Sequence, residues 1–164
     1  MAHSLHDWGQ FRPQSRKPMK IIGPTQVWVC CQEICEVVVH WTGGRTLPCD
    51  KFFGSKQCDL CAVELPALKE FWLLVADFRP RSKPVLVKLT IGAVEKSPNL
   101  LRHNGDLYGR LLLLSRATNS TRSAMTASLI ETEDFVTLPE PGDVLANLRK
   151  LWGAPDKRKG PGAP

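Results

Sequence analysis

Short apolar runs separated by polar stretches dominate the middle of the chain. In the run 84–91, Val85, Val87, Leu89 and Ile91 alternate with residues of the opposite face. A period of two is typical of a β-strand with two distinct faces. Further runs rich in β-branched, aromatic and aliphatic residues occur at 26–31, 35–41, 71–78, 108–117 and 124–131. We expect a strand in each of them.

Helical spacing is confined to few places. Residues 142–152 have apolar side chains at positions 144, 145, 148, 151 and 152, which predicts a C-terminal helix that packs on a sheet. Residues 62–70 are compatible with one or two helical turns, interrupted near Pro66. The stretch 92–106 is expected to be an irregular connection with a turn at 104–106.

Five or six short strands with one insert and one late helix indicate a mainly β fold, a small barrel or sandwich. Parallel α/β winding is not expected, because long helices do not alternate with the strands. The pattern places this β domain at 26–152, with the insert at 40–61.

Both ends of the chain have a different composition. Residues 1–25 mix Pro, Ser, Gln and basic residues and carry a net charge of +3, and we expect a flexible basic arm there. Residues 153–164 are rich in Gly and Pro, carry +2, and are expected to form a disordered basic tail. Of the total charge of +6, only +1 remains for 26–152. The excess fits either a polyanionic partner or solvated ends.

The apolar runs also bear on location. None approaches the roughly 18 residues that a membrane-spanning helix requires. The first 20 residues have no apolar core of the secretory type. We therefore expect a cytoplasmic protein without a membrane partner, in a compartment where thiols bind metals more often than they pair.

The insert contains a candidate metal site. His40, Cys49, Cys58 and Cys61 follow the spacing H-x8-C-x8-C-x2-C. Tetrahedral zinc takes four nitrogen or sulfur ligands, and a C-x-x-C turn supplies two of them from one side. The insert has too few apolar residues for a core of its own, so a metal would explain its order. Four protein ligands leave no open coordination position, which predicts a structural zinc.

Three other cysteines remain to be placed. Cys30, Cys31 and Cys35 are interpreted as small apolar strand residues. A rival ligand set replaces His40 by Cys35, although the two side chains would point to opposite faces of a regular strand. A redox role of the C-x-x-C pair is disfavoured because no βαβ pattern surrounds it.

The residues from 36 to 131 resemble a known family. A strand that ends in His40, then "GGRTLPC", a C-x-x-C pair and later aliphatic strands is similar to the T-even phage helix-destabilising protein and its distant relatives, which are single-stranded DNA-binding proteins. The segment 108–131, with an arginine-bearing strand before a loop, is also similar. The resemblance implies an OB-fold with a zinc-bearing insert, the ligands His40, Cys49, Cys58 and Cys61, and a role in DNA replication or recombination. The chain departs from the family by having one tyrosine and a nearly neutral core.

Aromatic and basic residues that lie next to each other are the candidates for contact with single-stranded nucleic acid, through base stacking and phosphate contacts. They are Trp41, Arg45, Lys51, Phe52, Phe53, Phe78, Arg79, Arg81, Tyr108, Arg110, Arg116 and Arg122. For each aromatic residue, packing in the core or over the zinc site is the alternative interpretation.

The sequence contains no phosphate-binding G-x-x-x-x-G-K-[ST], no H-E-x-x-H and no nucleophile elbow. We therefore expect a non-catalytic protein. One hypothesis is a single-stranded nucleic-acid-binding protein of low sequence specificity, with DNA favoured. The other is a zinc-stabilised structural or adaptor subunit that contacts protein partners through its tails.

Overall fold

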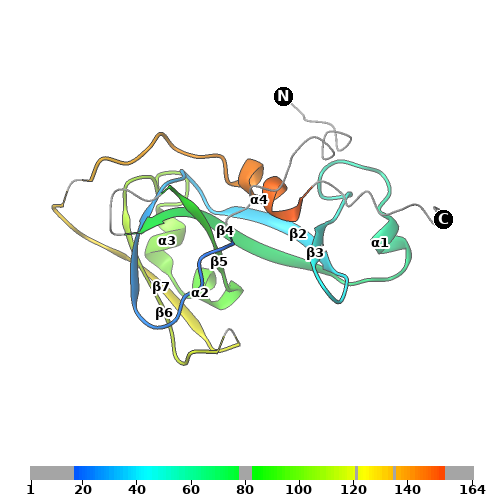
Figure 1. Cartoon of the computed structure of the whole chain (residues 1–164), viewed down its shortest axis with the longest axis horizontal. Coiled ribbons are helices and arrows are strands. Elements are labelled where there is room, and N and C mark those ends of the chain that lie inside the picture. Colours follow the sequence, from blue (N-terminus) through cyan, green and yellow to red (C-terminus); the bar gives the residue numbers. More distant parts are fainter. Residues whose placement is uncertain (1–16, 78–82, 121, 135, 154–164) are drawn as a thin grey trace. The chain divides into compact units, whose positions relative to one another are not determined.

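The computed structural model describes residues 17–77, 83–120, 122–134 and 136–153 (Figure 1). It has seven strands and four short helices among these residues. In chain order they are β1 (Thr25–Val29), β2 (Cys35–Trp41), β3 (Thr46–Pro48), α1 (Asp59–Ala62), β4 (Ala67–Asp77), β5 (Val85–Leu89), α2 (Ile91–Glu95), α3 (Pro98–Arg102), β6 (Leu111–Arg116), β7 (Met125–Ile130) and α4 (Val144–Trp152). The mainly β character and the C-terminal helix are confirmed.

The strands form one antiparallel sheet. Its order is β3-β2-β4-β1-β6-β7, and β5 pairs with β4. The partial order β6-β1-β4-β5 is that of a Greek key, in which a fourth strand returns to lie beside the first. No pairing among the described residues joins the two ends of this order, so the sheet is open.

The chain divides into two compact units. The described part of one, here called the cysteine unit, comprises Val37–Lys69 and residues 145–153. The other, the sheet unit, comprises Lys17–Glu36 and Glu70–Val144. The predicted single domain at 26–152 thus consists of two units, each with its own segments of β2 and β4.

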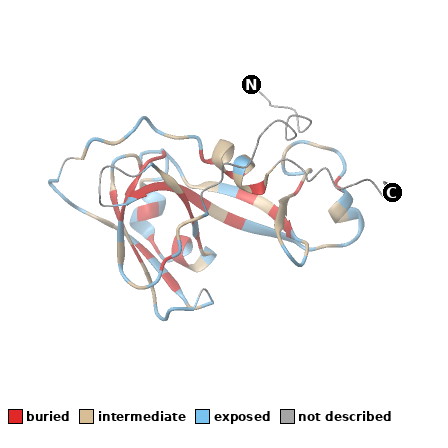
Figure 2. Ribbon diagram, in the orientation of Figure 1, coloured by how far each residue is buried: buried red, intermediate tan, exposed pale blue. Residues whose placement is uncertain are grey.

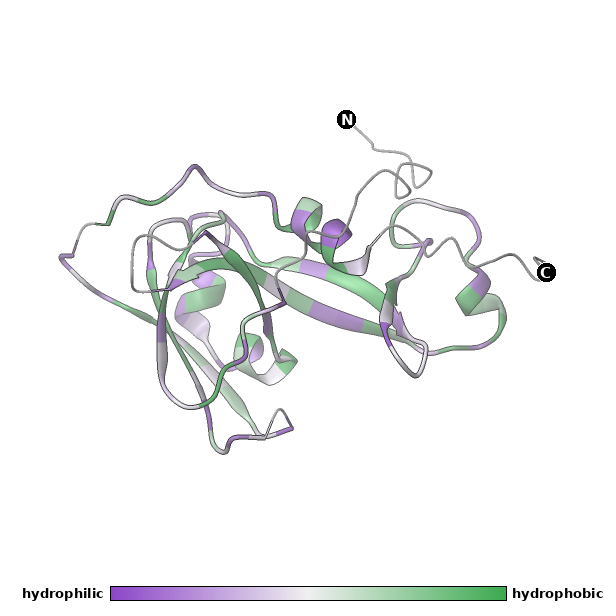
Figure 3. Cartoon of the chain, viewed as in Figure 1, coloured by the Kyte–Doolittle hydropathy of each residue, from purple (hydrophilic) through white to green (hydrophobic). Residues whose placement is uncertain are grey.

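The core of the sheet unit comes from the alternating apolar residues of its strands (Figure 2). The same segments are the most hydrophobic parts of the strands (Figure 3). Completely buried side chains include Val27, Val29, Leu73, Val75, Val87, Leu112 and Leu114. Burying each contributes roughly 1.5–3 kcal/mol, which explains why these runs form the central strands.

One buried carboxylate fixes the register of β4 and β5. Glu70 accepts hydrogen bonds from Trp72 Nε1 at 3.0 Å and from Lys88 Nζ. Trp72 and Lys88 lie directly opposite each other, with the ammonium 5.9 Å from the ring centroid. Because a buried charge without partners is costly, a shift of register would be strongly disfavoured.

Two sequence-based expectations about elements were wrong, and one strand was missed. Residues 62–70 do not form helical turns around Pro66, because β4 already begins at Ala67 and α1 ends at Ala62. The short strand β3 was not predicted. The connection 92–106 is not irregular, since it contains most of α2 and all of α3.

Local capping explains the two missed helices. The hydroxyl of Thr90 accepts a hydrogen bond from the backbone N–H of Ala93 at 3.2 Å and starts α2. Pro98 occupies the first turn of α3, where its missing N–H costs nothing. Ile91, predicted to continue the alternation of the preceding strand, instead lies exposed at the start of α2.

Part of the predicted N-terminal arm contacts the sheet unit. The backbone N–H of Met19 donates to the carbonyl of Leu86 at 2.8 Å, Ile21 is buried, and Thr25 begins β1. The rest of that arm, residues 1–16, lies outside the described residues, as does the tail from 154 to 164. Within the described part of the chain, no helix has the length and apolar character needed to cross a membrane.

Candidate metal centre

A β-hairpin positions His40 and Cys49. In the pairing of β2 with β3, His40 lies opposite Leu47. The loop closes because the backbone N–H and the hydroxyl of Thr42 both donate to the carbonyl of Arg45, at 3.0 and 2.9 Å. Gly43 has a φ of +87°, a conformation that glycine adopts without steric cost. The backbone N–H of Cys49 then donates to the carbonyl of Val38 at 2.9 Å, which draws the end of β3 back onto β2.

The C-x-x-C pair forms the second half of the cluster. Cys58 is extended and immediately precedes α1, and its carbonyl accepts from the N–H of Ala62 at 3.0 Å. This single helical turn places the side chains of Cys58 and Cys61 on one side. Glu64, with a φ of 60°, reverses the chain, and its N–H donates to the carbonyl of Cys61. The predicted knuckle is therefore a short helical turn with a left-handed exit.

The ligand atoms of His40, Cys49, Cys58 and Cys61 all lie within 4.8 Å of one another. Cys49 Sγ and Cys61 Sγ are 3.7 Å apart. The Nε2 atom of His40 is 3.5 Å from Cys58 Sγ and 3.4 Å from Cys61 Sγ. Around a tetrahedral zinc, sulfur–sulfur edges are about 3.8 Å and sulfur–nitrogen edges about 3.6 Å. The spacing of the four residues is thus compatible with a structural zinc.

The second nitrogen of His40 orients the ring. Nδ1 lies 3.1 Å from the carbonyl oxygens of both Leu65 and Pro66. A carbonyl only accepts, so Nδ1 carries the proton and Nε2 presents its lone pair to the three sulfurs. The ring is completely buried. Backbone support of this kind is common around histidine ligands, and here it comes from the chain that links the knuckle to β4.

The thiols have unequal proton affinities. Burial raises the pKa of Cys58, but backbone N–H groups of Cys61, Asp50 and Leu60 and the Cys61 thiol more than offset it, so that the pKa falls to about 7. Burial and the neighbouring thiols of Cys49 and Cys58 raise the pKa of Cys61 to about 11. A cation bound between Cys58 and Cys61 would stabilise negative charge on both sulfurs at once.

The C-terminal helix α4 contacts the loop after Cys49 and the β2–β3 hairpin within the cysteine unit. The ring of Phe53 meets that of Trp152 edge to face, with centroids 6.1 Å apart. The guanidinium of Arg45 donates to the carbonyl of Trp152 at 2.9 Å and so caps the end of α4. Phe53 and Arg45, both candidates for nucleic-acid contact, hence hold α4 in place.

Three other candidates of the cysteine unit face solvent. Trp41 is 52% exposed and Phe52 is 43% exposed, and Lys51 is exposed as well. Phe52 rests with one edge against Phe53, at a centroid distance of 5.2 Å. The rings of Trp41 and Phe52 therefore lie at the surface. Trp41 directly follows His40 in the sequence, and Phe52 is close to Cys49.

The remaining candidates belong to the sheet unit or lie outside the described residues. The hydroxyl of Tyr108 donates to the carbonyl of Pro139 at 2.7 Å. Arg110 forms an ion pair with Asp106 at 2.7 Å, and Arg116 donates to the carbonyl of Ser123. Arg122 is exposed. Phe78, Arg79 and Arg81 lie outside the described residues.

The three other cysteines are absent from the cluster. Cys30 and Cys31 are completely or almost completely buried, and Cys35 is half-buried. Burial raises the pKa of each of these thiols to about 11. They therefore behave as small apolar groups, and the rival ligand set with Cys35 in place of His40 is not the one that the structure brings together.

Sequence reasoning missed a pocket of about 440 Å³ in the sheet unit. Asn99, Arg102 and His103 contribute to its rim. These three residues follow the spacing i, i+3, i+4, which places side chains on one face of a helix. The spacing would have indicated a shared face only if residues 98–102 had been predicted to be helical.

No protein-family model, no curated protein and no solved structure matches this chain.

Proposed function

We propose that this chain is a non-catalytic single-stranded nucleic-acid-binding protein of low sequence specificity, with DNA favoured and a structural zinc in the cysteine unit. The observation that carries the proposal is the surface of that unit. Trp41 and Phe52 expose large aromatic rings on the unit that also carries the excess of positive charge.

The two units differ in charge. The described part of the cysteine unit contains six Lys or Arg residues and three Asp or Glu residues, so its net charge is +3. The described part of the sheet unit contains nine basic and eleven acidic residues, so its net charge is −2. The net charge of 26–152 is therefore close to zero although the cysteine unit is basic. A polyanion is attracted to the cysteine unit more strongly than to the sheet unit.

Stacking on the two rings would supply the rest of the affinity. Every base has a π-face, so stacking tolerates all sequences and contributes roughly 1–3 kcal/mol per base. Trp41 follows the ligand His40, and Phe52 lies three residues after the ligand Cys49. A zinc held by these ligands does no chemistry. It keeps the two rings at fixed positions, so that less ordering entropy is lost on binding.

We also propose that the sheet unit is an OB-like barrel. Its strand order β5-β4-β1-β6-β7 and its Greek-key arrangement support this, since an OB-fold is a five-stranded, partly open Greek-key barrel. Nuclear Overhauser effects between β5 and β7 would establish closure. Their absence, together with strong effects for the registered pairs, would leave an open sheet.

The test of strand binding is fluorescence anisotropy with labelled oligo-dT and oligo-rU, titrated with salt. We expect tighter binding to oligo-dT and an affinity that falls as salt rises. Trp41→Ala and Phe52→Ala should each weaken binding roughly fivefold or more, as expected for the loss of a stacked base. Ile22→Ala is the control, because Ile22 is also a strongly exposed apolar residue but belongs to the sheet unit.

A different outcome would reject the proposal. If the parent protein, loaded with zinc, does not bind either oligonucleotide at low salt, strand binding is excluded. The same holds if Trp41→Ala and Phe52→Ala bind as well as Ile22→Ala does.

The adaptor hypothesis has an observation of its own. Val63 and Leu68 are also strongly exposed in the cysteine unit. Aliphatic side chains do not stack on bases, whereas exposed apolar groups are common at protein interfaces. In the adaptor case, Val63→Ser and Leu68→Ser would abolish association with a protein partner, and the parent protein would not bind the oligonucleotides at low salt.

A further inference from the structure

The pocket of the sheet unit combines an apolar floor with a polar rim. Trp28 of β1, Leu111 of β6, and Leu129 and Ile130 of β7 supply apolar surface. Its volume of about 440 Å³ lies within the usual range for sites that bind small molecules. Trp28 and Leu111 are almost fully buried and close the bottom of the pocket, whereas the half-buried Leu129 and Ile130 offer most of its accessible apolar surface.

The walls of the pocket are held by hydrogen bonds. The hydroxyl of Tyr108 fixes the segment 138–139 by donating to the carbonyl of Pro139. Arg110 donates to both the carboxylate and the carbonyl of Asp106, each at 2.7 Å. The backbone N–H groups of Gly105 and Leu107 donate to the carbonyl of Gln32. A ligand would therefore find walls that need little reorganisation.

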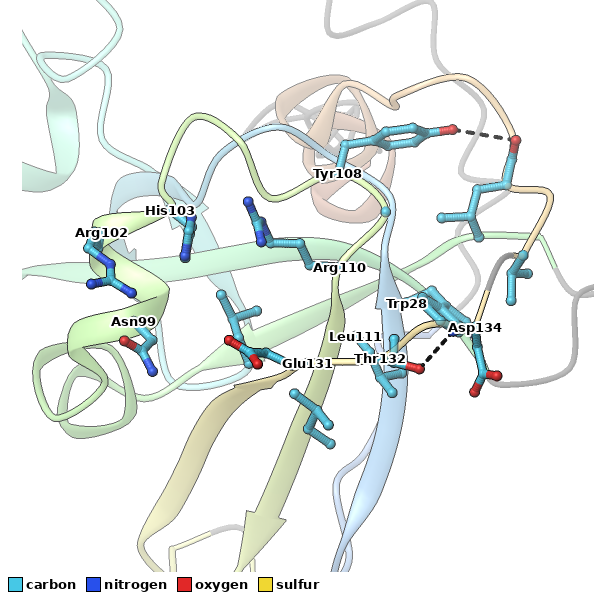
Figure 4. A pocket seen from close by; sticks show the side chains of 15 residues that line it. Trp28, Asn99, Arg102, His103, Tyr108, Arg110, Leu111, Glu131, Thr132 and Asp134 are labelled. Carbon is cyan, nitrogen blue, oxygen red and sulfur yellow. Dashed lines mark hydrogen bonds between the residues drawn. The ribbon is translucent and has the colours of Figure 1, made fainter.

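Polar side chains from one face of α3 and from the residue that follows it line this cavity. Asn99, Arg102 and His103 follow the spacing i, i+3, i+4, and Figure 4 shows them with Arg110 on one side of the pocket. Glu131 lies between this group and the opposite side, where Trp28 and Asp134 are found (Figure 4). Among the described residues, no side-chain hydrogen bond or ion pair is formed by Asn99, Arg102 or Glu131.

The balance of charges limits the class of ligand. Two arginines and two carboxylates line the pocket, and one of the arginines is already paired with Asp106. A phosphate, sulfate or other simple anion would meet Glu131 and Asp134 at unfavourable cost. A neutral ligand that offers both donors and acceptors, on a planar apolar body, fits these groups better.

We propose that this pocket binds a single unpaired guanine base. The guanidinium of Arg102 only donates, and the O6 and N7 atoms of guanine form the two-acceptor edge that arginine recognises in bidentate fashion. The carboxylate of Glu131 only accepts, and the guanine amino group donates. The ring would lie on the apolar floor. Uracil and thymine lack an amino group, and adenine presents a donor beside N7 where Arg102 needs an acceptor.

This site is separate from the stacking surface of the cysteine unit, and it does not rest on strand binding there. Since the base is uncharged, binding of guanosine should depend little on salt. Strand binding by the cysteine unit should depend on it strongly. The two proposals can therefore fail independently.

The experiment is a titration of the full-length, isotope-labelled, zinc-loaded chain with guanosine, adenosine, uridine and inorganic phosphate, followed by NMR. We expect guanosine to shift resonances of residues 99–111 and 129–134, with at least tenfold tighter binding than uridine. Arg102→Ala should weaken guanosine binding roughly tenfold or more, as for the loss of one bidentate pair. Lys96→Ala is the control, because Lys96 is an exposed cation of the same unit that does not line the pocket.

A second arm identifies the source of the base, by comparing oligo-dT with the same strand containing one central guanine. If the guanine strengthens binding in the parent but not in Arg102→Ala, the base comes from a strand. If Arg102→Ala weakens the binding of guanosine but not that of the strand containing guanine, the ligand is a free nucleoside.

Three results would overturn the proposal. Guanosine and uridine could bind equally, guanosine could leave the pocket resonances unshifted at millimolar concentration, or phosphate could shift them with the same dependence on Arg102. The last result would identify an anion site. Thermal unfolding of Arg102→Ala separates loss of the contact from loss of the fold, and Glu131→Ala gives an independent second variant.

Discussion

The imidazole of His40 is constrained from two sides. Two backbone carbonyls hold Nδ1, and the sulfurs of Cys58 and Cys61 lie within 3.5 Å of Nε2. Cys35 belongs to the same strand but lies half-buried outside the cluster. Burial raises the pKa of its thiol to about 11, so that the thiol stays protonated at neutral pH. At the scale of single residues, the environment therefore separates the three thiols clustered around His40 from the apolar thiols.

His40→Ala and Cys58→Ser should each lose the metal, because three ligands rarely retain a structural zinc. Cys35→Ser and Cys30→Ser should keep about one metal ion per chain. Elemental analysis of protein purified without chelator gives the measurement. Zinc loss in Cys35→Ser but not in His40→Ala would show that the ligand set is wrong.

Raised thiol pKa values predict a loss of stability at alkaline pH. The pKa of Cys30 and of Cys31 is raised by burial from 9.0 to about 11. Below pH 9 both thiols are protonated in the folded and the unfolded chain, so their contribution to stability is complete. Between pH 9 and 11 the unfolded chain releases these protons and the folded chain does not, so the free energy of unfolding falls.

Urea denaturation at pH 8 and pH 10.5, in the parent and in a variant with both thiols replaced by alanine, measures this effect. The variant should lose less stability between the two pH values than the parent. Equal losses would assign the alkaline effect to other groups, including the thiols of the metal cluster.

At the scale of elements, the segment before α4 is tied closely to the sheet. The N–H of Gly142 donates to the carbonyl of Cys30 at 2.8 Å. A Cβ atom at this position would lie 2.2 Å from Cδ2 of Leu74, which is buried in β4. Only glycine allows so close an approach, and this contact sets where the chain leaves the sheet unit.

Gly142→Ala should reduce the free energy of unfolding by about 1–3 kcal/mol, because Leu74 must move within a packed core. Gly92→Ala is the control. Gly92 lies in α2 with open space around its Cα, and alanine there should stabilise the helix by about 0.5–1 kcal/mol. Chemical denaturation measures both. If Gly142→Ala is as stable as the parent, the chain approaches the sheet less closely than described.

At the scale of the whole molecule, the two units rely on different sources of stability. The sheet unit buries aliphatic residues from each of its five strands. The cysteine unit has fewer completely buried side chains, and His40 is one of them. We propose that a metal held by His40, Cys49, Cys58 and Cys61 takes the place of part of a hydrophobic core there.

Removal of the metal by a strong chelator should therefore act unequally. Amide hydrogen exchange should accelerate sharply across Val37–Lys69, whereas the paired residues of β6 and β7 should remain protected. Added zinc should restore protection. A uniform acceleration, or none at all, would contradict the idea that the metal stabilises one unit in particular.

Much of the site could be predicted without the fold. The spacing of one histidine and three cysteines identified the four residues that converge, because a C-x-x-C turn is a local structure and metal ligands are few in kind. The alternating run around Val87 identified a strand for the same reason, since a period of two is written directly in the chain. The assignments of Phe53 and Arg45 could not be made this way, because both depend on Trp152, which is about one hundred residues distant.

By itself, the sequence determined the strand-rich core, the C-terminal helix and the identity of the clustered ligands, since each rests on local periodicity or on the chemistry of a few side chains. Tertiary structure alone decided which aromatic rings remain exposed, how the charge divides between two units, and that Asn99, Arg102 and Glu131 share one pocket. These features arise from contacts between segments far apart in the chain, and no local pattern encodes which segments will meet.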